Sequence, residues 1–223
     1  MAAPEGLDPD ASAGDLGRRE RRKLEIRNRV LDASVTLFQQ RGIEQTTVVE
    51  ICAVADVAEK TFFNHFSSKR ELLREIARYG MEQLLQQIED ARKQGACSAD
   101  RIERFFARVA EHEDEAGPMG RELLSEVVHI GHEAGDEPEQ ARRLHEAFGA
   151  IVRDGVAAGD LRGDHSPETL TEMIMGTYYV LMFNRANLDD YPLHERALET
   201  ARFLIDALCI GGRAIEATED REG

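Results

Sequence analysis

Side chains that can bind phosphates and base edges gather between Thr46 and Leu73, in the stretch TTVVEICAVADVAEKTFFNHFSSKRELL. The stretch contains a short apolar segment, a break at residues 55–57, and a second short segment rich in polar and aromatic residues. Lysine, asparagine, threonine and histidine donate hydrogen bonds to phosphates and base edges, and glutamate accepts from cytosine. Nucleic-acid recognition uses this chemistry. The candidate contact residues are Thr47, Glu59, Lys60, Thr61, Phe63, Asn64, His65 and Lys69.

These basic residues stand out because the chain as a whole is acidic. Its 223 residues carry a formal net charge of −15, yet residues 18–70 contain 11 Lys and Arg against 7 Asp and Glu. Such an asymmetry favours a small basic module that faces a polyanion, joined to a larger acidic body. The alternative is chance clustering of charges on a solvated helix face.

Helix signals indicate how these residues are positioned. Apolar residues recur at helical spacing from Leu24 to Phe38, and again in a long segment from about Lys69 to Gln94. Two short helices separated by residues 55–57 are expected between them. The residues expected to end or cap these helices are Gly42, Thr46 or Thr47 with Glu50, Asp56 with Glu59, and Ser67 or Ser68.

From about Lys23 to Leu73 the chain resembles the N-terminal DNA-binding domain of the TetR family of bacterial transcriptional regulators. The resemblance rests on VLDASVTLFQQRG at residues 30–42 and on the stretch quoted above. It implies a helix-turn-helix that binds a palindromic DNA operator as a homodimer, usually as a repressor that a small organic effector releases. The positions that agree in the second stretch are Thr47, Ile51, Ala53, Ala55, Val57, Thr61, Phe62, Phe63, His65, Phe66, Lys69 and Leu72.

The resemblance assigns roles to the candidate residues. The second short helix of a helix-turn-helix enters the major groove. Thr47 and Lys69, at the starts of two helices, are expected to grip phosphates on either side of it. Glu59 could accept from cytosine, Lys60 could reach guanine and Thr61 could touch a thymine methyl group. The basic run at residues 18–23 is expected to act as a flexible arm that adds phosphate attraction.

Three positions depart from the family pattern. Asp56 stands where glycine is usual, Ala58 where serine is usual, and Phe63-Asn64 where a tyrosine pair is usual. The phenol that commonly donates to a phosphate is therefore missing. Asn64 could donate to a phosphate or to a base instead. Phe63 could touch DNA or pack inward.

The remaining chain is expected to be helical as well, which gives an all-α protein of about nine helices. The expected plan is a disordered tail at 1–17, a helix-turn-helix domain at 18–70, a ligand-binding and dimerisation domain at 71–213, and a flexible tail at 214–223. In LTEMIMGTYYVLMF, 10 of 14 residues are apolar. A helix that is apolar all round is buried on more than one side.

The helix expected at 167–184 and its neighbour at 192–210 are therefore predicted to pair across a two-fold axis in a homodimer. A central helix in a monomer is the alternative. The middle helices are expected to line an apolar pocket for a small organic effector, although any of these residues could be ordinary core. The candidate ligand residues are Phe105, Phe106, Leu123, Val127, Phe148, Met173, Thr177 and Tyr178.

An enzymatic reading rests on EVVHIGHE, where Glu126, His129 and Glu133 lie on one face of an expected helix. Half of a carboxylate di-iron site has this spacing, but a second Glu-x-x-His is absent from the chain. No metal or other cofactor is therefore expected. The three cysteines show no zinc or redox spacing, and no apolar run is long enough to span a membrane. A cytoplasmic location is expected.

Overall fold

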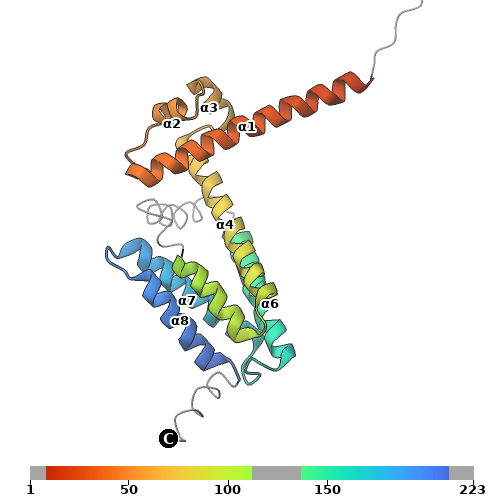
Figure 1. Cartoon of the computed structure of the whole chain (residues 1–223), viewed down its shortest axis with the longest axis vertical. Coiled ribbons are helices and arrows are strands. Elements are labelled where there is room, and N and C mark those ends of the chain that lie inside the picture. The colour runs from red at the N-terminus through yellow and green to blue at the C-terminus, as the bar shows by residue number, and fades with distance from the viewer. Residues whose placement is uncertain (1–8, 112–136, 211–223) are drawn as a thin grey trace, which may run out of the picture. The chain divides into compact units, whose positions relative to one another are not determined.

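The computed structural model describes residues 9–111 and 137–210, with side chains from residue 17 of the first range and from residue 139 of the second. Within these ranges, every secondary-structure element longer than one residue is a helix, which confirms the all-α prediction (Figure 1). An additional helical segment covers 98–111. The named helices are α1 (Pro9–Arg41), α2 (Val48–Val54), α3 (Glu59–His65), α4 (Lys69–Gln94), α6 (Glu137–Ala158), α7 (Pro167–Asn187) and α8 (Leu193–Leu208).

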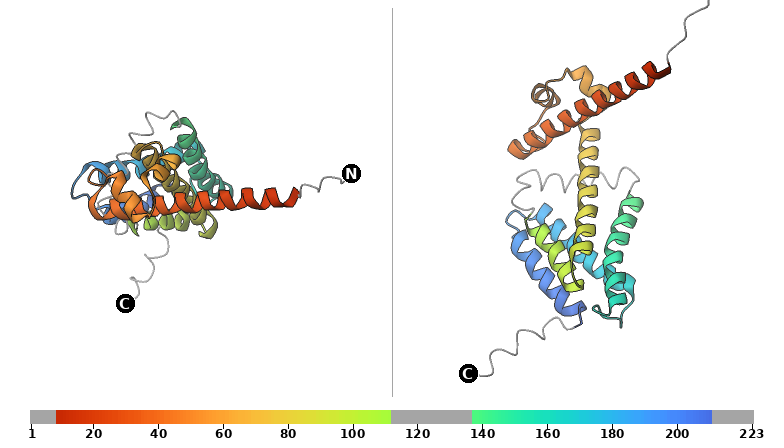
Figure 2. Two further views of the ribbon diagram at one scale, coloured as in Figure 1. Left: turned by 90° about the horizontal axis from the view of Figure 1, so that it is seen from above. Right: turned by 45° about the vertical axis from the view of Figure 1, so that its right-hand side comes forward.

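The chain divides into two compact units, Met1–Leu72 and Leu73–Gly223. In the first unit, α1 is longer than the sequence indicated. It begins at Pro9, so residues 9–17 of the predicted disordered tail and the predicted flexible arm at 18–23 are helical. Figure 2 shows this end of α1 extending beyond α2 and α3. The helix ends where expected, at Gly42, whose φ of 87° suits only a residue without a Cβ atom.

The short helices of the first unit begin in two different ways. Thr47 caps α2 with a complete capping box, because its hydroxyl accepts from the Glu50 amide at 3.3 Å and the Glu50 carboxylate accepts from the Thr47 amide at 2.8 Å. The predicted cap of α3 by Asp56 is wrong. Ala58 occupies the cap position without a side-chain bond, and Asp56 forms the turn with a φ of 51°.

A small apolar core holds the first unit together. Its fully or nearly fully buried side chains come from all four helices of that unit, and the centroids of the Phe62 and Phe66 rings lie 5.7 Å apart. Burying each such side chain contributes roughly 1.5 to 3 kcal/mol, and this packing fixes α3 against α1 and α2. The largest of these side chains are Phe38, Ile51, Phe62, Phe66 and Leu72.

The second unit has a larger core, to which α4, the segment 98–111, α6, α7 and α8 all contribute. Asp160 joins its parts at one end. Its carboxylate accepts from the Ser98 amide at 2.9 Å and the Ser98 hydroxyl at 2.5 Å, and its carbonyl accepts from the Ile210 amide at 2.9 Å. Ser166 caps α7, and Pro167 occupies its first turn.

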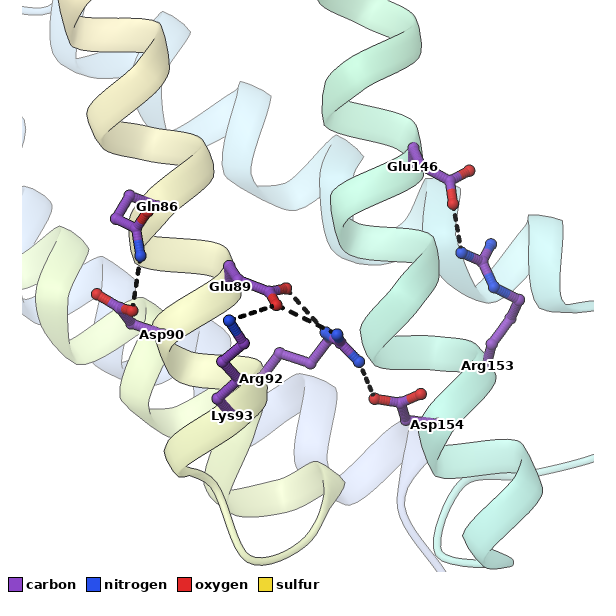
Figure 3. A network of polar contacts seen from close by, with 8 residues as sticks. All are labelled: Gln86, Glu89, Asp90, Arg92, Lys93, Glu146, Arg153 and Asp154. Carbon is purple, nitrogen blue, oxygen red and sulfur yellow. Dashed lines mark hydrogen bonds and ion pairs between the residues drawn. The ribbon is translucent and has the colours of Figure 1, made fainter.

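Ion pairs tie α4 to α6 within the second unit (Figure 3). Arg92 on α4 lies 2.6 Å from Asp154 on α6 and 2.9 Å from Glu89, its neighbour one turn back. The hydrogen bonds that Glu89 accepts from Arg92, followed by that from Lys93, lower the pKa of Glu89 to about 2. Further along the same two helices, the guanidinium of Arg143 binds both carboxylate oxygens of Glu82 at 2.7 and 2.8 Å.

Candidate nucleic-acid interface

The outer face of α3 presents polar side chains around one aromatic ring. Glu59, Lys60 and Asn64 are exposed, and Thr61 is partly buried. Phe63 is 50% exposed, whereas Phe62 beside it is fully buried. Since residues three and four apart share a helix face, Lys60, Phe63 and Asn64 lie together on the outside of α3. The structure thus brings these predicted residues to one surface and directs Phe63 outward.

His65 belongs to a different side of α3. Its Nδ1 atom is buried without a hydrogen-bond partner, and its carbonyl accepts from the Arg27 guanidinium at 3.5 Å. Burial, followed by the charges of Lys23 and Arg27, lowers the pKa of His65. The imidazole therefore lies at the junction of α3 with α1, next to cationic side chains.

The hydroxyl of Thr47 is engaged within the protein. It donates to the Glu50 carboxylate at 2.8 Å in addition to its role as the cap of α2. Glu50 also binds Arg41 at 2.9 Å. The hydrogen bonds from Thr47, followed by the charge of Arg41, lower the pKa of Glu50. The start of α2 is thereby fixed before any ligand binds.

Lys69 also has protein partners. Its ammonium group donates to the carbonyl oxygens of Ile43 and, at 2.7 Å, of Thr46. It lies 6.0 Å from the centre of the Phe38 ring. These contacts join the start of α4 to the loop between α1 and α2. The ammonium group that was predicted to bind a phosphate is thus hydrogen-bonded within the first unit; its contact with DNA stays a prediction.

Two arginines of α1 were missed by the sequence reasoning. Arg27 lies over the Phe66 ring, 4.7 Å from its centre, and Arg29 donates to the Asp56 carbonyl at 3.1 Å. Both hold α1 against α3 and the turn before it. The available signal was the basic spacing of Lys23 and Arg27, which are four residues apart and so share a helix face.

The predicted ligand residues that the structure describes lie in two places. Four aromatic members come together in the core of the second unit: the ring centroids of Phe105 lie 5.1 Å from Phe106, 5.1 Å from Phe148 and 5.6 Å from Tyr178. Burial raises the pKa of the Tyr178 phenol. Leu123 and Val127 lie outside the described residues.

Met173 and Thr177 lie elsewhere, in an open groove of about 520 Å³ formed by α7 and α8. Apolar side chains such as Val180 and Phe203 also line it. The prediction that these two residues share a pocket with the four aromatic residues is not supported by this arrangement. Because α7 is apolar all round, the sequence could not distinguish the two faces.

The residues proposed for a metal site, Glu126 and His129 with Glu133, also lie outside the described ranges. Within those ranges, no group of three or more His, Cys, Asp or Glu residues is placed to hold a metal ion. The cysteines there are all free thiols. Among the described helices, none is both long and apolar enough to cross a membrane.

The chain is similar to a family of bacterial regulatory proteins and to a transcriptional repressor. Residues 30–76 match the family profile of bacterial regulatory proteins of the tetR family. The HTH-type transcriptional repressor KstR2 of Rhodococcus jostii is 25% identical over 77% of this chain and 81% of its own length.

Solved structures show the same fold. FadR of Bacillus subtilis in complex with stearoyl-CoA has a TM-score of 0.56 at 19% identity, covering 79% of this chain and 96% of its own. SmeT of Stenotrophomonas maltophilia in complex with triclosan has a TM-score of 0.61 at 18% identity, covering 84% and 93%. The matched proteins are transcriptional regulators, which favours regulation over the metal-enzyme reading.

Proposed function

Since this chain belongs to the TetR family of bacterial regulatory proteins, we propose that it is a ligand-responsive transcriptional repressor that binds a palindromic DNA operator in the cytoplasm. The observation that carries the proposal is the outer face of α3, where exposed Lys60, Phe63 and Asn64 stand over a buried aromatic core. A helix presented in this way fits the major groove. Glu59, Lys60, Thr61 and Asn64 then read base edges, while Phe63 supplies an apolar contact.

A palindromic operator requires two copies of α3, and the α7–α8 face supports a homodimer. Met173, Val180 and Phe183 on α7 are 51%, 57% and 61% exposed, and Phe203 on α8 is 68% exposed. Exposed apolar faces of this kind mark interaction surfaces. Two copies of the α7–α8 pair related by a two-fold axis bury these side chains in a four-helix interface.

The effector is proposed to be a small, mainly apolar organic molecule bound near Phe105, Phe148 and Tyr178. The acyl chain of stearoyl-CoA in the FadR structure and triclosan in the SmeT structure support an apolar group of this general class. The aromatic cluster offers the apolar walls that such a ligand needs. Ligand binding in the second unit releases DNA if it favours a conformation in which the two copies of α3 no longer match the operator.

Selection from a pool of random duplexes tests the proposal. The full-length protein is incubated with the pool, and bound DNA is recovered and sequenced over several rounds. We expect an enriched palindrome whose half-sites are centred about one helical turn, or a multiple of it, apart. Binding should weaken steeply with salt because phosphate contacts release counterions. Failure to enrich any palindrome from a folded, dimeric sample would contradict the proposal.

A further inference from the structure

We infer that the extension of α1 at residues 18–27 forms a second DNA contact, on phosphates that flank the half-site read by α3. The inference rests on the proposed function and adds a surface to it. The extension is part of one continuous helix with the core of the first unit, so its position is set by that helix. Because it starts beside the end of α3, this basic segment lies next to the proposed recognition helix, unlike charged residues elsewhere on the surface.

The face of α1 that packs on the core changes character where it passes the end of α3. Towards the C-terminus this face consists of the buried residues Val30, Ser34 and Leu37. The same line of residues continues backwards, in steps of three or four, through Arg27, Lys23 and Arg19. An apolar stripe thus becomes a basic stripe on one side of one helix.

Contacts at Arg27 place the start of this basic stripe beside the recognition helix. The guanidinium of Arg27 lies over Phe66 and donates to the carbonyl of His65, the last residue of α3. The charge of Lys23 acts on His65 as well. The basic stripe therefore begins beside the end of α3. The part of α1 that carries it extends away from α3 (Figure 2).

The dimensions of the helix indicate how far the contact reaches. Lys23 and Arg19 are four and eight residues before Arg27, so they lie about 6 and 12 Å from it along the helix axis. A duplex places successive phosphates of one strand about 3.4 Å apart along its axis. An α1 that follows the duplex would therefore reach about two to four base pairs beyond the residues at the end of α3.

A phosphate backbone fits the composition of this surface. Residues 18–29 contain seven Lys or Arg and two Asp or Glu, and the exposed Arg18, Arg21 and Arg22 flank the stripe. No apolar patch accompanies these charges between residues 18 and 23, where only basic and acidic residues occur. Such a contact adds affinity without reading sequence, because phosphates carry no base information.

The test compares two duplexes that contain the selected operator. One ends at the outer base pair of each half-site, and the other carries six further base pairs of random sequence at each end. Affinity is measured by fluorescence anisotropy at several salt concentrations, for the wild-type protein and for the double variant Arg19→Gln/Lys23→Gln. Glutamine preserves helix propensity, and Arg27 is left in place because it packs on Phe66.

We expect the wild-type protein to bind the longer duplex more tightly and with a steeper salt dependence. The double variant should lose that advantage and retain its affinity for the short duplex. The slope of log affinity against log salt should fall by about 3 to 4 units if both residues of both protomers contact phosphates. Hydroxyl-radical footprints should show protection of the flanks by the wild-type protein only.

The variant Lys93→Gln/Arg104→Gln is the matched control, because it removes two exposed charges from the second unit. It shows how much of any change follows from the loss of two positive charges, irrespective of their place on α1. Equal binding of both duplexes by the wild-type protein, or an equal loss on both duplexes in the variant, would overturn the inference. A change in sedimentation without DNA would instead assign the stripe to an acidic surface of another copy. If no operator is selected at all, the proposed function itself fails.

Discussion

Exposed aromatic rings occur in both units, but the side chains around them differ. Phe63 on α3 is 50% exposed and stands beside Lys60 and Asn64 on a helix of seven residues. Phe203 on α8 is 68% exposed and faces a groove that it shares with Met173 and Val180. The first ring packs on Phe62 at one side and has hydrogen-bonding groups beside its exposed part, whereas the second belongs to a continuous apolar surface.

This difference separates two kinds of partner. A polar helix face with one ring suits a hydrated polyanion, where hydrogen bonds supply specificity. A broad apolar face is stable only when another apolar surface covers it. The neighbouring side chains, rather than the exposed ring itself, therefore indicate the partner.

The largest effect is expected at the apolar surface. Phe203→Glu should raise the dimer dissociation constant by about 100-fold or more, since a central interface aromatic residue contributes about 2 to 4 kcal/mol. Operator affinity should fall with it, because two recognition helices are then no longer joined. Analytical ultracentrifugation measures the dimer, and circular dichroism confirms the fold. Arg202→Glu, an exposed neighbour on α8, is the control; equal dissociation in both variants would remove Phe203 from the interface.

A smaller and more selective effect is expected on α3. Asn64→Ala should alter the preference among operator sequences at one base pair, by about 1 to 3 kcal/mol, if the amide reads a base edge. Anisotropy titrations against a set of single-substituted operators measure this preference. The exposed amide of Gln83 in the second unit provides the control variant Gln83→Ala. A uniform loss across all operators would assign Asn64 to a phosphate instead.

A substitution at Lys69 distinguishes a role in positioning the helices from a direct contact with DNA. Its ammonium group binds two carbonyl oxygens, so Lys69→Met should lower the free energy of unfolding by about 1 to 2 kcal/mol. Operator affinity should weaken equally for all sequences because α2 and α3 are held less firmly. Urea denaturation measures the stability. Unchanged stability together with a salt slope reduced by about two units, one for each protomer, would show that Lys69 contacts a phosphate.

The sequence predicted the features that depend on local chemistry. The capping box of Thr47 and Glu50 and the glycine that ends α1 each involve residues a few positions apart. The predicted cap of α3 was wrong, because Asp56 matches the capping pattern in the sequence but adopts a left-handed conformation in the turn. The start of α1 was missed because a segment rich in Gly, Ala and Asp has little apolar periodicity.

Features that depend on contacts between residues far apart in the chain could not be predicted from the sequence. The partners of Lys69 lie 23 and 26 residues away along the chain. Likewise, α7 is apolar on every side, so its pattern did not indicate that Tyr178 packs with Phe105 while Thr177 faces α8. Knowing which face packs on which neighbour requires the fold itself.

The turn at Asp56 allows a modest gain in stability. Its φ of 51° is costly for a residue with a Cβ atom, and glycine adopts it without strain. Asp56→Gly should therefore raise the free energy of unfolding by about 0.5 to 1 kcal/mol in urea denaturation. Arg29 binds the backbone carbonyl at this position, so that hydrogen bond is retained. Asp56→Val, which is β-branched, should be destabilising; a more stable valine variant would contradict the strain argument.

The smallest effect concerns the inner side of α3, where His65 contrasts with the outward residues Lys60 and Asn64. Burial and the nearby charges of Lys23 and Arg27 lower the pKa of His65 below its usual value of about 6.5. As the pH falls below about 6.5, the unfolded chain therefore binds a proton at this residue more readily than the folded chain, and the free energy of unfolding decreases.

His65→Asn should reduce this loss of stability between pH 7 and pH 5, as measured by urea denaturation at each pH. If His65→Asn steepened the decrease, the imidazole would be charged in the folded protein, and the junction of α1 with α3 would be more hydrated than its buried Nδ1 atom indicates.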